Sequence, residues 1–176
     1  MKFLVILLLL TGNFLSQGKE DQEVDLQLRD LLTDKEFRDY RRKPRYRDRV
    51  DLFKKVFDRN AHLLLQHVKR NELGKSGDLL LQIQALCQYV EQEAAQAKEP
   101  KDLRSKQAKQ LEIRLRRLVA TIKNLQATIP WEYLDQFEVT AQALEKLRKL
   151  LLTHLLGEAL AARSFPGQSE PGGSIG

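Results

Sequence analysis

Residues 111–129 read LEIRLRRLVATIKNLQATI, and their apolar positions carry the clearest structural signal in the chain. The apolar residues step by 4, 3, 4, 3 and 4 positions: Leu111, Leu115, Leu118, Ile122, Leu125 and Ile129. A 3.5-residue repeat is typical of a helix that packs lengthwise against a near-antiparallel neighbour or in a coiled coil. The repeat therefore predicts a long helix over 101–129 whose basic residues stay off the apolar seam.

Segments on both sides of this repeat also show helical spacing. Apolar residues recur with a 3.6-residue period in 46–71, in 78–98 and from Pro130 to about residue 163. Pro44, Pro100 and the run Gly74-Lys75-Ser76-Gly77 mark the predicted breaks between these helices. Trp131 and Phe137 have helical spacing at the start of the last segment, which predicts that they pack in the core or at its end.

Two shorter helical segments are predicted before residue 44. Residues 21–32 begin with an alternating pattern and then return to helical spacing. Thr33 and Glu36 have the spacing of a capping box, in which each side chain satisfies a backbone N–H of the first turn. A new helix, or a kinked continuation of the preceding one, is therefore predicted over 34–43.

The predicted fold is all-α: an up-down bundle of about four long helices with a short N-terminal helical segment against one side. The alternative is a long helical hairpin that completes its core by dimerising, because a heptad can find its partner helix in a second copy. A homodimer is therefore left open.

Both ends of the chain differ from the predicted bundle. Residues 1–18 combine a Lys near the start, an apolar run and small residues before a polar segment, the pattern of a secretory signal peptide. A retained membrane anchor is the alternative. Residues 164–176 are rich in Pro, Gly and Ser and predict a disordered tail. The bundle domain is thus predicted over 19–163, in the periplasm or secreted, with no transmembrane span after signal cleavage.

The most unusual feature is a basic segment at residues 38–49. It holds seven basic residues against two acidic ones, whereas the whole chain has a net charge of +6. Lys2 leaves with the predicted signal peptide. The formal charges of the residues after 18 that lie outside the basic segment therefore sum to zero. The seven candidate binding residues are Arg38, Arg41, Arg42, Lys43, Arg45, Arg47 and Arg49.

Two hypotheses explain the basic segment. Arginine forms bidentate contacts with carboxylates and phosphates, so the segment can dock on an acidic protein or on an anionic envelope surface. Nucleic acid is a chemically suitable partner, but the predicted signal peptide argues against it. Alternatively, these residues pair with acidic residues of neighbouring helices and serve the fold.

The remaining candidates for chemistry are sparse. His62 and His67 are five residues apart and diverge on a helix, so a metal site requires His154 to approach one of them. Gly74-Lys75-Ser76 resembles the end of a phosphate-binding loop, but it lacks the preceding strand and glycine and is interpreted as an inter-helix turn. Because Cys87 is the one cysteine, an internal disulfide framework is excluded. Cys87 is predicted to be a buried apolar residue, and pairing with a cysteine of another molecule is the alternative.

These observations favour a non-enzymatic helical interaction protein without a cofactor. The alternative is a metal- or cofactor-binding bundle with a redox or sensory role, which requires a histidine to meet a glutamate inside the bundle. An enzyme whose site forms only through tertiary structure is a third hypothesis.

Overall fold

The computed structural model describes residues 28–97 and 100–156. Every regular element in this part of the chain is helical, which confirms the all-α prediction. None of its helices is both long enough and apolar enough to cross a membrane. The predicted signal peptide, the predicted tail, residues 21–27 and residues 157–163 lie outside the described residues.

The chain divides into two compact units at Arg42 and Lys43. In the first unit, residues 28–31 are helical and α2 spans Asp34–Arg41. The capping box is confirmed, because the Glu36 N–H donates to Thr33 Oγ1 at 3.3 Å and the Thr33 N–H donates to Glu36 Oε2 at 2.8 Å. The helix predicted over 34–43 therefore begins where expected and ends two residues earlier.

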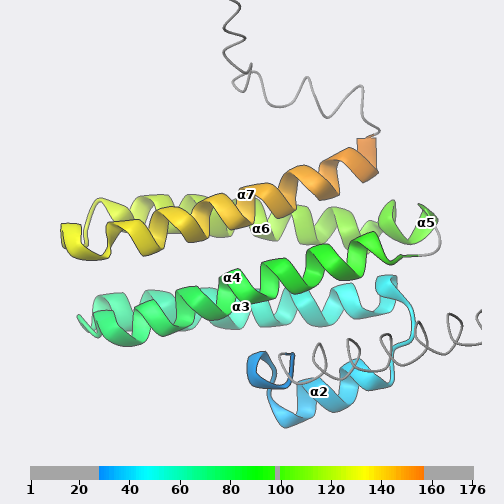
Figure 1. The fold of residues 1–176 in the computed structure, drawn as a ribbon, viewed down its shortest axis with the longest axis horizontal. Coiled ribbons are helices and arrows are strands. Elements are labelled where there is room, and N and C mark those ends of the chain that lie inside the picture. Colours follow the sequence, from blue (N-terminus) through cyan, green and yellow to red (C-terminus); the bar gives the residue numbers. More distant parts are fainter. Residues whose placement is uncertain (1–27, 98–99, 157–176) are drawn as a thin grey trace, which may run out of the picture. The chain divides into compact units, whose positions relative to one another are not determined.

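The second unit is a bundle of four long helices. They are α3 (Tyr46–Lys69), α4 (Leu73–Ala95), α6 (Lys106–Gln126) and α7 (Leu134–Leu156) (Figure 1). A short helix, α5 (Pro100–Leu103), lies between α4 and α6, and the 3₁₀ helix η1 (Trp131–Tyr133) leads into α7. This arrangement confirms the predicted bundle of four long helices.

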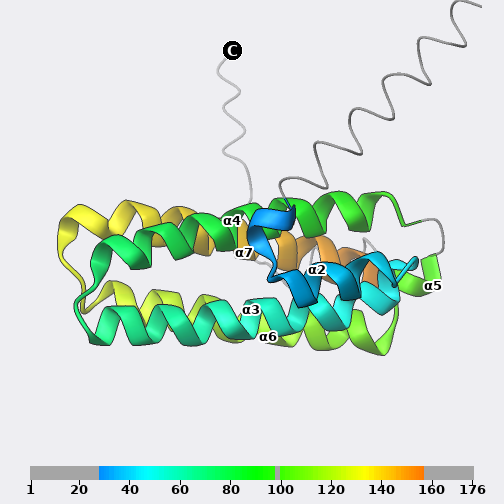
Figure 2. The same ribbon diagram turned by 90° about the horizontal axis from the view of Figure 1, so that it is seen from below.

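Successive long helices run in opposite directions, but two that follow each other along the chain, α4 and α6, are not neighbours in the bundle. α3 packs beside α4 and α6, and α7 packs beside the same two helices (Figures 1 and 2). Side-chain contacts from Gln84 to Thr140 and from Glu91 to Lys146 show that the neighbours α4 and α7 run parallel. The connection through α5 therefore carries the chain diagonally across the end of the bundle.

The apolar seam of α6 forms part of the core. Leu111, Leu115 and Ile122 are fully buried and Leu118 is 5% exposed, whereas Leu125 and Ile129 are only half-buried. The largest buried side chains on the other long helices include Phe53, Phe57, Leu80, Ile83, Phe137 and Leu144. Thus α6 finds its packing partners, α3 and α7, within the same chain.

The predicted break at Gly74-Lys75-Ser76-Gly77 is wrong. These residues lie in the first turns of α4, and the chain turns at residues 70–72, where Asn71 has a φ of 57°. Two contacts explain the difference: Ser76 Oγ donates to Glu72 O at 3.2 Å, and the missing Cβ of Gly77 lets the Gln136 side chain approach closely. Tertiary packing here overrides the low helix propensity of glycine.

The helix predicted over 101–129 is also divided in the structure. Residues 100–103 form α5, and α6 begins at Lys106 after Ser105, whose hydroxyl accepts a hydrogen bond from the Ala108 N–H at 3.2 Å. A serine cap of this kind starts a new helix. The interruption allows α5 to turn across the end of the bundle.

Candidate functional site

The predicted basic segment straddles the boundary between the two units. Arg38 and Arg41 lie in α2, Arg42 follows its end, and Lys43 begins the second unit. Four of the seven side chains are exposed, namely Arg38, Arg41, Arg42 and Arg45. Lys43, Arg47 and Arg49 are half-buried, so the segment is a series of differently placed side chains and not one uniform patch.

Arg49 is held inside the second unit. Its Nη1 lies 2.8 Å from Glu93 Oε1 and 2.7 Å from Glu93 Oε2, and its Nε donates to Lys43 O at 2.6 Å. The Tyr89 hydroxyl donates to Glu93 Oε1 at 2.9 Å. This network joins the start of α3 to α4 and to the residues before α3. Arg49 therefore fits the alternative hypothesis, in which a basic residue pairs with an acidic residue of a neighbouring helix.

Arg47 has a much weaker ionic contact than Arg49. Its Nε lies 3.8 Å from Asp48 Oδ1, and both side chains are more than 40% exposed. A contact between exposed charges at this distance contributes little to stability. Arg47 and the exposed Arg45 are therefore two members of the segment in the second unit that can reach an outside partner.

A polar pocket of about 340 Å³ lies next to this network. It is lined by residues before and at the start of α3, near the end of α4 and in α5: Pro44, Arg45, Tyr46, Arg49, Glu93, Gln96, Ala97 and Asp102. Asp102 is 6% exposed, and it forms no hydrogen bond or ion pair within the described part of the chain. The pocket thus combines two arginines with two carboxylates.

Tyr46 is the other unusual group at this pocket. It is 5% exposed, and its hydroxyl is buried without a hydrogen-bond partner among the described residues. Burial, with a smaller contribution from the negative charge of Glu93, raises the pKa of Tyr46 well above its usual range. Tyr46 therefore stays a neutral phenol, and stacking on a partner through this ring is not open to it.

The three histidines do not converge. His62 is exposed beside Gln66, and His67 Nδ1 lies 2.6 Å from Glu72 Oε2 near the end of α3. His154 lies at the opposite end of the bundle, where its carbonyl accepts from Arg104 Nε at 3.2 Å. Within residues 28–97 and 100–156, no three metal-ligating side chains are grouped so that they could hold an ion.

Cys87 occupies the core, as the sequence predicts. Its side chain is fully buried in α4. Burial, with a smaller effect of the Glu91 charge, raises the pKa of the Cys87 thiol far above its usual value. The group is thus a neutral thiol that packs as an apolar residue.

The burial of Cys87 predicts a specific dependence of stability on pH. An unfolded cysteine ionises near pH 8.5 while the folded thiol does not, so stability is complete below that pH and falls above it. The slope of this decrease is expected to be about 0.7 kcal/mol per pH unit at about pH 8.5 and to approach about 1.4 kcal/mol per pH unit by about pH 10. Urea unfolding of the wild type and of Cys87→Ala checks this, and equal slopes for the two proteins would contradict it.

Trp131 does not pack in the core, contrary to the sequence prediction. Its side chain is 77% exposed in η1, whereas Phe137, six residues later, is 1% exposed. The 3₁₀ turn explains the difference, because α7 begins only at Leu134 and its helical spacing does not extend back to Trp131. Trp131 is therefore an exposed residue at the turn between α6 and α7.

Helix α6 contains a concentration of charge that the running sum along the chain conceals. It holds six basic residues and only one acidic residue, Glu112. Glu112 is itself buried and pairs with Arg148 of α7 at 3.2 Å. A sum of charges taken over each predicted helix would have revealed the positive charge of α6 from the sequence.

Comparison with known proteins gives no match to this chain: no family model, no curated protein and no solved structure is significantly similar to it. Functional inference therefore rests on the residues themselves.

Proposed function

We propose that this chain is an extracytoplasmic, non-enzymatic helical interaction protein that docks on an anionic partner through the basic segment, residues 38–49. The partner is an acidic protein surface or the anionic envelope itself. The observation that carries the proposal is the exposure of Arg38, Arg41 and Arg42 at the end of the first unit and of Arg45 near the start of the second.

The chemistry of the exposed residues supports this proposal. An arginine guanidinium stays charged at any physiological pH and forms paired hydrogen bonds with a carboxylate or phosphate. Several such groups within twelve residues raise the local concentration of an anionic partner and accelerate its association. Arg49 has a different role, because its guanidinium is engaged by Glu93.

The test compares two triple substitutions that change the net charge equally. The first is Arg42→Glu, Arg45→Glu and Arg47→Glu in the basic segment. The control is Lys75→Glu, Lys146→Glu and Lys149→Glu, at exposed positions on α4 and α7. Immobilised polyglutamate serves as the probe, and binding is measured against salt concentration.

The segment variant is expected to lose about tenfold or more in affinity at low salt, while the control variant binds like the wild type. Circular dichroism checks that all three proteins are equally helical. Equal binding by the segment variant and the wild type would overturn the proposal. An equal loss of affinity in the control would also overturn it, because binding would then depend on net charge and not on the basic segment.

A further inference from the structure

We propose that the face formed by α3 and α6 binds an anionic phospholipid surface. This surface belongs to the second unit alone, and the inference goes beyond the proposed role of the basic segment because it depends on other residues. It would place the bundle flat on an anionic membrane with α3 and α6 against the headgroups.

The charge of the bundle is divided between two opposite faces. Together α3 and α6 hold twelve basic residues and four acidic ones, and ten of the twelve lie outside the basic segment, which contributes Arg47 and Arg49. The other two long helices, α4 and α7, hold four basic residues and six acidic ones. Because α3 lies beside α6, and α4 beside α7, one side of the bundle is strongly positive and the opposite side is slightly negative (Figure 2).

Much of the positive charge on this face is not neutralised by other residues among 28–97 and 100–156. Lys54 pairs with Asp51 at 2.6 Å, and Arg114 pairs with Asp58 at 2.6 Å. Five other side chains are exposed and form no ion pair in the part of the chain that the structure describes, namely Lys55, Lys69, Lys106, Lys109 and Arg117. These five residues are called the basic face below.

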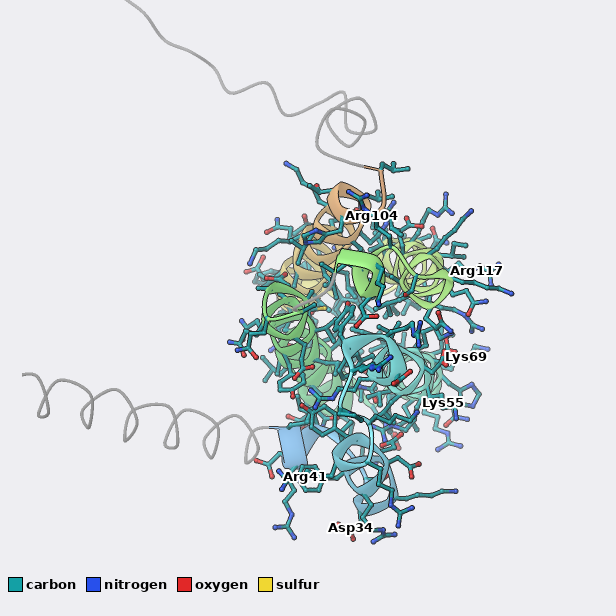
Figure 3. All side chains as sticks on the ribbon, turned by 90° about the vertical axis from the view of Figure 1, so that its right-hand side faces the viewer. Asp34, Arg41, Lys55, Lys69, Arg104 and Arg117 are labelled. Carbon is teal, nitrogen blue, oxygen red and sulfur yellow. The ribbon has the colours of Figure 1, made fainter. Side chains whose placement is uncertain are left out.

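The basic face is extended along the helices. Lys55, Lys69 and Arg117 point away from the same side of the bundle (Figure 3). Lys55 and Lys69 are fourteen residues apart on one helix, which corresponds to about 21 Å. Two helices side by side give the face a width of about 20 Å. A planar anionic surface can contact all of this area at once.

The shape of the face favours lipid over nucleic acid. The major groove of DNA is about 12 Å wide and admits one helix, so two helices packed side by side cannot enter it. The tyrosine and phenylalanine residues of α3 are buried and α6 has no tyrosine, phenylalanine or tryptophan, so the face offers none of these larger rings for a base to stack on. The negative charge on α4 and α7 would further orient the bundle with α3 and α6 toward an anionic plane.

The interaction is expected to be electrostatic, without insertion into the bilayer. The large apolar side chains that are exposed in the described residues lie elsewhere, on α4, η1 and α7: Leu81, Trp131, Val139 and Leu156. Since exposed charges are screened over about 10 Å at 0.1 M salt, binding should be reversed by salt. A lysine or arginine near an anionic leaflet contributes about a fivefold gain in binding.

The experiment measures partitioning of residues 19–176, the chain expected after signal cleavage, onto vesicles. The probe is phosphatidylcholine containing about one-quarter phosphatidylserine, with pure phosphatidylcholine as the lipid control. The face variant is Lys106→Glu, Lys109→Glu and Arg117→Glu, and the control is the same α4 and α7 triple used above. A second face variant with glutamine at the three positions keeps the test valid if the first one folds poorly.

Wild type and control are expected to bind the anionic vesicles and not the neutral ones. The glutamine variant should bind about a hundredfold more weakly, and the glutamate variant more weakly still. Unchanged binding by both face variants, or an equal loss in the control, would overturn the proposal. So would wild-type binding to a DNA duplex with none to the vesicles. Polyglutamate binding by the Arg42, Arg45 and Arg47 variant reports separately on the proposed function, so the two proposals can fail independently.

Discussion

Replacing Phe137 by alanine is expected to lower the free energy of unfolding by about 3–5 kcal/mol. Phe137 is 1% exposed in the core between α7 and its neighbours, so its removal loses apolar burial and leaves a cavity that the surrounding helices cannot fully close. The change in the midpoint of urea unfolding measures this loss.

Trp131→Ala is the matched control for Phe137→Ala. Trp131 is the larger aromatic residue, but it is 77% exposed, so its replacement should change the free energy of unfolding by less than about 0.5 kcal/mol. A loss comparable to that of Phe137→Ala would show that the turn between α6 and α7 is packed in solution. Circular dichroism of both variants would confirm that the helices form.

The sequence predicts the core well wherever the apolar spacing is set within one helix. Leu111, Leu115 and Ile122 are fully buried because a helix that packs on two neighbours must bury its regularly spaced apolar stripe. The prediction weakens at the ends of the stripe. Leu125 and Ile129 are half-buried because α6 ends at Gln126, and apolar spacing alone does not fix the end of a helix.

Of the incorrect predictions, one concerns a position where a tertiary contact outweighs local preference, and another concerns a local turn that apolar spacing does not reveal. Glycine residues at 74 and 77 indicate a turn on propensity alone, yet α4 begins at Leu73 because Gly77 permits close packing against Gln136. The spacing of Trp131 continues the apolar pattern of α7, although the chain there forms a 3₁₀ turn. The contact between Gly77 and Gln136 joins two distant segments, and the 3₁₀ turn leaves no mark in the apolar spacing. Neither feature can therefore be read from a single segment of sequence.

For the candidate surfaces too, the sequence reveals charges that are contiguous but not those brought together by helix packing. The basic segment is visible in the sequence because its charges are contiguous, but the engagement of Arg49 by Glu93 depends on the packing of α3 against α4. The basic face is invisible to a running sum because Lys55 and Lys106 are far apart in sequence. It appears only when α3 and α6 are placed side by side.

The ion pair between Arg49 and Glu93 leads to the second large expected effect. The Arg49 side chain is 21% exposed and that of Glu93 is 12% exposed, and Glu93 also accepts a hydrogen bond from Tyr89. Glu93→Gln removes, with little change in shape, the negative charge that both contacts of Arg49 Nη1 reach, at a half-buried position. The expected loss in the free energy of unfolding is about 2–3 kcal/mol, somewhat below the range for fully buried pairs.

Asp58→Asn is the control for Glu93→Gln. It breaks the contact to Arg114, which has a similar length of 2.6 Å but joins side chains that are 45% and 47% exposed. Water screens such a pair, so its loss should lower the free energy of unfolding by less than about 1 kcal/mol. Equal losses for the two variants would show that the Arg49 pair is solvated in solution.

A double-mutant cycle separates the interaction energy of the Arg49–Glu93 pair from the individual effects of the two substitutions. Arg49→Leu and Glu93→Leu should each destabilise the protein because each leaves one charge unmatched, while the double variant should lose less than the sum of the two. An additive double variant would contradict a direct coupling between them. Because a strong coupling makes Arg49 a structural residue of the α3–α4 contact, its substitution would disturb folding and docking together. For that reason Arg42, Arg45 and Arg47 are the positions at which binding by the basic segment can be measured separately from stability.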